Sequence, residues 1–239
     1  MLTAKHDFDG RLVVVTGGTG ALGSAVVERL LGCGARVRVP VFDPRELEGS
    51  PFVGDGRVAT VEGVDLSEPE AVEAFYAPAD GLFASIHVAG GFAMGKVAGA
   101  DQPEAFARMM RMNAHTADLC SRRAVIAMAG SAEGGRIVNT TARPGLIPRE
   151  GGGMVPYATS KAAVAAMTEA LAREVASQRI WVNAVAPSIL DNEANREAMP
   201  DADHDAWPKP DQLAETMVFL ASPANRVTTG GIVPVYGSQ

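Results

Sequence analysis

Three consecutive segments near the N-terminus constrain the fold most. Residues 11–16 form a short apolar run rich in valine, which is typical of a buried parallel strand. Gly17, Gly20 and Gly23 follow at intervals of three residues, and residues 25–31 then form an apolar helical stretch. A strand, a glycine-rich turn and a helix in this order predict a βα unit.

The glycine turn also predicts a binding site. Residues without a β-carbon let the backbone turn tightly and approach a pyrophosphate, which the positive N-terminus of the next helix attracts. The flanking strand and helix supply the context that a dinucleotide-binding unit requires, although an ordinary βα turn is the alternative. We expect the cofactor to contact Gly17, Gly18, Thr19, Gly20, Ala21, Leu22 and Gly23.

An acidic residue indicates which dinucleotide is bound. Residues 36–42 are predicted to form the second strand, and Asp43 follows it, 20 residues after Gly23. An acid at this spacing binds the adenosine ribose diol and repels a 2′-phosphate, which favours NAD(H). Arg45 lies two residues further on and softens this preference, so NADP(H) is not excluded. Alternatively, Asp43 is a loop acid or the cap of the next turn.

The remaining chain alternates strand-like and helix-like segments. Strands are predicted at 57–64, 82–88, 135–141, 180–186 and 231–236, and helices at 67–77, 103–129, 154–178 and 211–221. Ser67 and Glu70 match a capping box for the first of these helices. Repeated βα units predict one α/β domain over residues 1–239, with a parallel sheet of about seven strands and helices on both faces. Residues 188–210 are proline-rich and charged, and we expect a mobile substrate loop there.

Composition narrows the possible partners and location. The net charge is −7 and no basic cluster is present, which argues against a nucleic acid or membrane-surface partner. Cys33 and Cys120 are too few for a disulfide framework, and neither a secretory signal nor a membrane-spanning run is found. We therefore expect a cytoplasmic protein. The four histidines and two cysteines lack ligand spacing, so no metal site is expected.

Tyr157 and Lys161 form the strongest candidate for chemistry. Residues four apart share one face of a helix, so the two side chains lie close together. An ammonium about 5 Å from a phenol favours the phenolate by roughly 3 kcal/mol at an effective dielectric near 20. The pKa of Tyr157 would then fall towards neutrality, where a proton donor is useful. The alternative is an ordinary pair on a helix surface.

Together with Ala89-Gly90 after the fourth strand, these motifs resemble the short-chain dehydrogenase/reductase superfamily. The resemblance implies a doubly wound Rossmann-type domain, a nicotinamide cofactor and hydride transfer. It implies that Tyr157 exchanges a proton with the substrate oxygen. Lys161 would lower the pKa of Tyr157 and hold the nicotinamide ribose, and Asn113 would support a proton-relay water.

The same resemblance implies further cofactor contacts and an oligomer. Asp65 and Leu66 would lie near the adenine, and Pro187 and Ile189 over the nicotinamide. Further contacts would come from Ala89, Gly90, Gly91 and Asn113, beside Tyr157 and Lys161. In this family the helix at 154–178 commonly packs against a partner subunit, so a homodimer or homotetramer is expected.

Several departures from the family pattern leave the substrate open. Ala21 replaces a usual glycine, His87-Val88 precedes Ala-Gly, and Ala142 stands where the family has its substrate-orienting serine. Thr140 or Thr141 is a candidate substitute, but only Thr140 shares a strand face with Ala142. Similar departures occur in the dihydropteridine reductase branch, which this chain locally resembles. We expect a small carbonyl, alcohol or pterin-like substrate; the alternative is a dinucleotide-binding sensor or scaffold without turnover.

Overall fold

The computed structural model describes residues 7–99 and 102–238 and confirms the expected fold class. A seven-stranded parallel sheet has the strand order β3-β2-β1-β4-β5-β6-β7. Its strands are β1 (Leu12–Thr16), β2 (Arg36–Val41), β3 (Val58–Glu62), β4 (Leu82–His87), β5 (Gly135–Thr140), β6 (Ile180–Pro187) and β7 (Ile232–Val235). The strand order reverses between β1 and β4, and ligands of such sheets bind beyond the carboxyl ends at this point.

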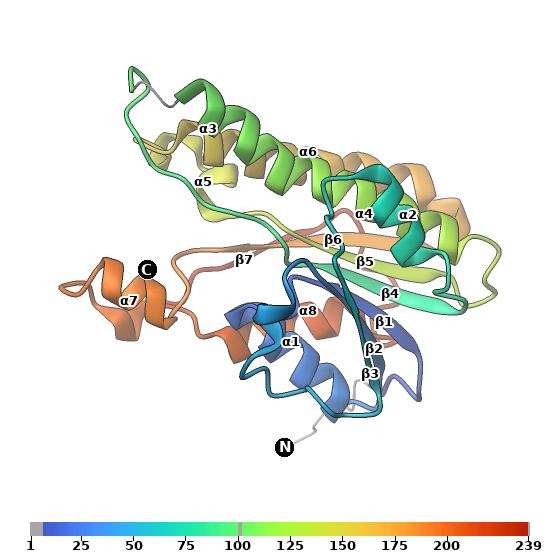
Figure 1. The fold of residues 1–239 in the computed structure, drawn as a ribbon. Coiled ribbons are helices and arrows are strands. Elements are labelled where there is room, and N and C mark those ends of the chain that lie inside the picture. The colour runs from blue at the N-terminus through green and yellow to red at the C-terminus, as the bar shows by residue number, and fades with distance from the viewer. Residues whose placement is uncertain (1–6, 100–101, 239) are drawn as a thin grey trace.

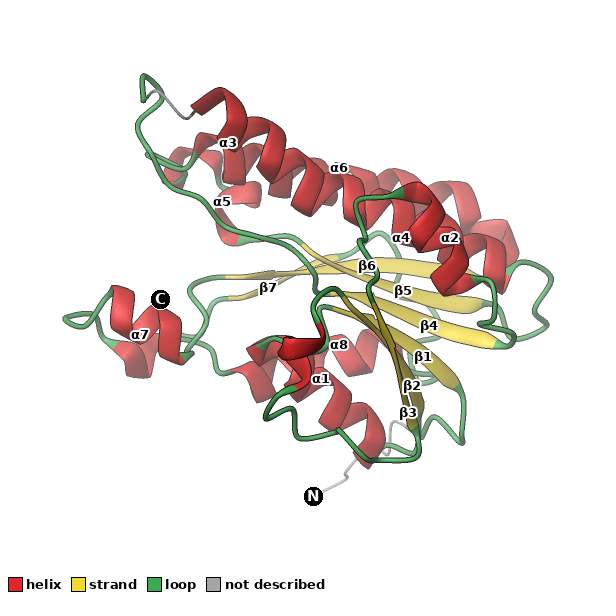
Figure 2. Cartoon of the chain, viewed as in Figure 1, coloured by secondary structure: helices red, strands yellow, loops and turns green. Residues whose placement is uncertain are grey.

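Helices cover both faces of the sheet (Figures 1 and 2). On one face α1 (Ala21–Gly32) packs against α8 (Pro210–Ala221). The opposite face carries α2 (Pro69–Tyr76), α3 (Gln102–Met109), α4 (Thr116–Met128) and α6 (Val155–Val175). The short α5 (Arg143–Leu146) lies beside α6, and α7 (Glu193–Ala198) lies near the C-terminus, away from both layers.

Alternation along the strands produces the two cores. Val13 and Val15 of β1 lie in the core beneath α1 and α8, whereas Val14 between them lies in the core beneath α2, α4 and α6. All three valines are fully buried. Successive strand side chains point to opposite faces, so a continuous apolar run serves both layers. The sequence-based assignment of residues 11–16 as a buried strand is thereby confirmed.

Two local predictions differ from the structure. The capping box of Ser67 and Glu70 is wrong: α2 begins at Pro69, and the Ser67 hydroxyl donates to Asp65 Oδ1 at 2.8 Å. Proline fits the first helical position because its missing N–H has no partner to lose there. The predicted helix at 103–129 is interrupted by a π-helical segment, Met110–His115, between α3 and α4.

Within the part of the chain that the structure describes, no helix is both long enough and apolar enough to cross a membrane.

Candidate active site

The glycine turn between β1 and α1 is packed tightly against its own backbone. A β-carbon at Gly23 would lie 1.9 Å from the Gly17 carbonyl oxygen, and one at Gly17 would lie 2.7 Å from the Ala89 nitrogen. Gly17 also has φ +65°, which favours glycine. Gly20 is the N-cap of α1, and a β-carbon there would be 3.6 Å from the Gly17 oxygen. This bare helix N-terminus fits a pyrophosphate.

The other residues of the turn divide between core and surface. Gly18 is buried, and a β-carbon on it would lie 2.7 Å from Cγ1 of Val39 in β2. The Leu22 side chain belongs to the core beneath α1, so only its backbone can face a cofactor. Ala21 opens α1. The turn thus offers mainly backbone groups, as a phosphate cradle requires.

The strand β2 is followed by a capped 3-10 turn that contacts the glycine turn. Asp43 caps the 3-10 turn Pro44–Leu47 and accepts from the Arg45 backbone N–H at 3.0 Å. Its carboxylate also forms an ion pair with the Arg45 guanidinium, which lowers the pKa of Asp43. Glu46 accepts from the Thr19 hydroxyl at 2.7 Å and so links this turn to the glycine turn. The alternative interpretation of Asp43 as a cap is confirmed, whereas its ribose contact stays a prediction.

The segments after β3 and β4 carry the remaining predicted contacts on this side. Asp65 accepts from both the backbone N–H and the hydroxyl of Ser67, each at 2.8 Å, and Leu66 packs against the core. The Ala89 N–H donates to Oγ1 of Thr16 at 3.3 Å, which brings the ends of β1 and β4 together.

Asn113 holds the segment after β4 in place. Its Oδ1 accepts from the Gly91 N–H at 2.8 Å, and its Nδ2 donates to the Gly91 oxygen at 3.0 Å. The same Nδ2 donates to the Ser160 hydroxyl at 2.9 Å. A β-carbon on Gly90 would lie 2.5 Å from Asn113 Oδ1, so glycine is required for this approach. The buried Asn113 therefore fixes both the glycine segment and α6, and the π-helical segment carries it there.

Tyr157 and Lys161 lie in the first two turns of α6, as predicted. Lys161 is buried, and its Nζ donates to the Thr140 oxygen at the end of β5 at 2.9 Å. The Tyr157 ring meets the exposed Phe92 ring edge to face, with centroids 4.9 Å apart. Lys161 thus contacts the end of β5, and Tyr157 contacts the segment that follows the neighbouring strand β4.

Burial dominates the titration of this pair. Burial raises the pKa of Tyr157 to about 12 and lowers the pKa of Lys161 to about 8. Both shifts have one cause, because desolvation disfavours the phenolate and the ammonium alike. The expected fall of the Tyr157 pKa towards neutrality is therefore wrong for this structure, whereas the role of Lys161 towards the phenol stays a prediction. A lysine that titrates near neutral pH can instead exchange protons readily.

The end of β5 has alanine where a hydroxyl was expected from the family pattern. Ala142 is buried and extended at the start of α5. The Thr140 hydroxyl donates to the His87 oxygen at 2.7 Å, and the Thr141 hydroxyl donates to the Lys161 oxygen at 2.6 Å. Both hydroxyl hydrogens are committed to the backbone. Neither threonine is therefore a ready donor in place of the serine.

A buried polar network beneath the site was missed by the sequence analysis. His87 Nδ1 lies 2.7 Å from Asn139 Oδ1, and its Nε2 lies 2.9 Å from the Ser85 hydroxyl. Ser85 bonds Tyr76 of α2, and Asn139 bonds Thr168 of α6. Burial lowers the pKa of His87 to about 4, so the ring is neutral at pH 7. Its only sequence signal is the polar pair Ser85 and His87, two residues apart on one strand face.

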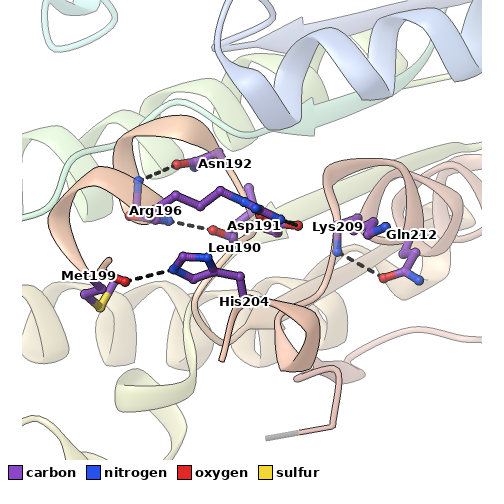
Figure 3. A network of polar contacts seen from close by, with 9 residues as sticks. Leu190, Asp191, Asn192, Arg196, Met199, His204, Lys209 and Gln212 are labelled. Atoms are coloured by element: carbon purple, nitrogen blue, oxygen red, sulfur yellow. Dashed lines mark hydrogen bonds and ion pairs between the residues drawn. The ribbon is translucent and has the colours of Figure 1, made fainter. Parts of the chain in front are cut away.

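The segment at 188–210 contains regular structure, including the helix α7. Asn192 caps α7, and Asp191 forms an ion pair with Arg196 within the same stretch (Figure 3). The ring of His204 lies 2.8 Å from the Met199 oxygen, as Figure 3 also shows. Pro187 ends β6, and Ile189 beyond it is exposed. The mobility of this segment stays a prediction.

No three side chains of histidine, cysteine, aspartate or glutamate gather as a metal site would require, across residues 7–99 and 102–238.

Comparison with known proteins identifies relatives that cover up to 97% of the chain. A family profile described as short chain dehydrogenase matches residues 11–203. Galactitol 2-dehydrogenase of Rhizobium johnstonii is 33% identical, over 97% of this chain and 95% of that protein. The 2,5-dichloro-2,5-cyclohexadiene-1,4-diol dehydrogenase of Sphingobium indicum is 28% identical, over 97% of each.

Solved structures show the same architecture. A putative gluconate dehydrogenase from Agrobacterium tumefaciens is 25% identical with a TM-score of 0.87, covering 98% of this chain and 96% of that one. ElxO with NADP bound is 21% identical with a TM-score of 0.84, covering 95% of this chain and 98% of that one. At this identity the likeness to ElxO concerns the fold alone.

Proposed function

The chain belongs to the short chain dehydrogenase family and is an NAD(P)(H)-dependent oxidoreductase, and we propose that Tyr157 is its proton-transferring residue. The nicotinamide, when bound, supplies or accepts the hydride. The observation that carries the proposal is the position of Tyr157 and Lys161 at the carboxyl ends of the strands, where the glycine turn also lies. Asn113 bonds α6 through Ser160, and Thr140 accepts from Lys161. Ligands of such sheets bind beyond these carboxyl ends.

The proton chemistry follows from the two pKa values. With a pKa of about 12, Tyr157 keeps its proton at neutral pH and can donate it to a carbonyl oxygen that gains negative charge. Lys161 donates one Nζ hydrogen to the Thr140 oxygen, and its other Nζ hydrogens can be donated to the nicotinamide ribose and to the phenol. We infer that Asn113 acts by positioning, since its amide is committed to Gly91 and Ser160. Support of a relay water by Asn113 stays a prediction.

The cofactor contacts are proposed to follow the carboxyl ends of the strands. Residues 17–23 would bind the pyrophosphate, and Asp65 with Leu66 would lie near the adenine. The nicotinamide end would meet the segment 89–91, Pro187 and Ile189. We propose that NAD(H) is preferred over NADP(H), because Asp43 and Glu46 place carboxylates at the end of β2. ElxO, which shares this fold, has a solved structure with NADP bound.

The substrate is proposed to be a small alcohol or carbonyl compound. The relatives are described as dehydrogenases of galactitol and of a cyclohexadiene diol, so open-chain and cyclic alcohols are both reasonable. A pterin-like substrate remains in the proposal because Ala142 leaves more room than serine and because a flat ring can lie against Phe92. We further propose a cytoplasmic location and a homodimer or homotetramer that packs through α6.

One experiment separates this proposal from a dinucleotide-binding protein without turnover. NADH affinity is measured by fluorescence titration of the wild type and of Tyr157→Phe. The oxidation of NADH is then followed with a panel of cyclic ketones, keto sugars and quinonoid pterins. Wild-type turnover that falls about 10²–10⁴-fold in the variant, at unchanged NADH affinity, supports the proposal. Equal turnover by both proteins shows that the proton comes from elsewhere. NADH binding without turnover of any compound favours the sensor or scaffold, which Ala142 and the committed threonine hydroxyls would suit.

A further inference from the structure

We propose that Glu46, rather than Asp43, is the carboxylate that discriminates against the 2′-phosphate of NADP(H). This inference rests on the proposed nicotinamide cofactor and on its proposed preference for NAD(H). It assigns the selection to a residue three positions beyond the acid that the sequence spacing indicates.

Asp43 is already committed within its own turn. Its carboxylate accepts from the Arg45 backbone N–H at 3.0 Å and from Arg45 Nε at 2.9 Å, and it also pairs with the guanidinium Nη2. The guanidinium therefore offsets the charge of Asp43 at very short range. A ribose hydroxyl or a phosphate that approached Asp43 would meet a nearly neutral pair.

Glu46 differs from Asp43 in both its contacts and its charge balance. One carboxylate oxygen accepts from the Thr19 hydroxyl at 2.7 Å, and the other accepts from the Asp43 N–H at 3.3 Å. Among the residues that the structure describes, neither a lysine nor an arginine pairs with it. No ion pair therefore offsets its negative charge, and its carboxylate is held against the glycine turn by Thr19.

The Glu46 carboxylate lies where NAD(H) and NADP(H) would be distinguished. In folds of this kind the adenosine ribose lies between the glycine turn and the end of the second strand. The Thr19–Glu46 bond spans that interval. A carboxylate there can accept a hydrogen bond from a ribose hydroxyl, whereas a dianionic phosphate in the same place would be repelled.

The test compares nucleotide binding, without turnover, in three proteins. Glu46→Gln keeps an oxygen for Thr19 but removes the charge. The double variant Asp43→Asn/Arg45→Ala removes the neighbouring pair and leaves Glu46 intact. Dissociation constants for NADH and NADPH are measured by fluorescence titration in low salt and again in about 0.5 M salt, which screens the interactions between surface charges.

We expect Glu46→Gln to tighten NADPH binding about tenfold, which is the effect of removing one charge about 6 Å from a dianion in a water-like dielectric. NADH binding should weaken, because the charged acceptor for the ribose hydroxyl is lost, so the two nucleotides should change in opposite directions. High salt should reduce the wild-type preference but not that of the variant. The double variant should still prefer NADH.

Three results would overturn the assignment. Loss of the preference in the double variant, with none in Glu46→Gln, would return the role to Asp43. Equal changes for both nucleotides in Glu46→Gln would mean that Glu46 only shapes the turn. A wild type that binds NADPH as tightly as NADH would show that neither acid selects. Failure of the wild type to bind either nucleotide would instead refute the proposed cofactor.

Discussion

Gly23→Ala is expected to weaken the binding of NADH strongly, because it creates a steric clash within the glycine turn that Gly20→Ala does not create. The new β-carbon at position 23 would lie 1.9 Å from the Gly17 oxygen, whereas ordinary contact begins at 3.4 Å. The turn cannot yield easily, because Gly17 is itself held against the Ala89 backbone. Overpacking of this kind costs about 1–3 kcal/mol, which for a domain of this size lowers the melting temperature by roughly 2–12 °C.

Gly20→Ala is the matched control because it adds the same methyl group three residues away. Its β-carbon would lie 3.6 Å from the Gly17 oxygen, so the expected cost to the stability of the free protein is a poorer helix cap, about 1 kcal/mol or less. The assay combines thermal unfolding with titration of NADH. We expect the affinity of Gly23→Ala for NADH to fall more than about tenfold, since the displaced amides no longer converge. If Gly23→Ala bound NADH as tightly as the wild type, the turn would not be the pyrophosphate cradle.

Three further predictions concern buried groups of the site. Because burial lowers the pKa of Lys161 to about 8, the folded protein favours the neutral amine, and the free energy of unfolding should rise by up to about 3 kcal/mol as the pH increases from about 8 to 10.4. Urea unfolding of Lys161→Met should lack this rise, and an identical rise in both proteins would contradict the assignment. Because burial lowers the pKa of His87 to about 4, the free energy of unfolding should fall as the pH decreases from about 6.5 towards 4, and His87→Asn should show a shallower fall. Ala142→Ser should raise turnover of simple ketones about tenfold or more through an added donor to the developing oxyanion, but should not raise turnover of a flat pterin-like ring; kcat measured with both classes decides between them.

Much of the fold could be predicted because its strands are short, buried and parallel. Residues 12–15 contain no polar side chain, so their β-branched and apolar residues alone indicate a strand, and β1 lies there. Local capping chemistry was less predictable. Ser67 had a competing partner in Asp65, and the propensity of Pro69 for the first helical position set the boundary of α2.

The positions of Tyr157, Lys161 and Asn113 could be predicted from local motifs, but their interactions could not. The pKa of Tyr157 depends on burial, which arises when α6 packs against segments far away in the sequence. The clamp of Asn113 on Gly91 joins residues 22 positions apart, and the bond from Thr19 to Glu46 joins residues 27 positions apart. No spacing rule indicates such contacts, because they depend on how the loops at the sheet edge meet.

Isotope transfer tests the central claim most directly. NADH carrying deuterium at C4 of the nicotinamide is incubated with the protein and the panel of carbonyl compounds, and the products are examined by mass spectrometry. The account predicts that at least one product gains deuterium at its carbinol carbon with the wild type, and that Tyr157→Phe forms at least about 100-fold less of it while still binding NADH. Products without deuterium, or equal labelling by Tyr157→Phe, would contradict hydride transfer assisted by Tyr157.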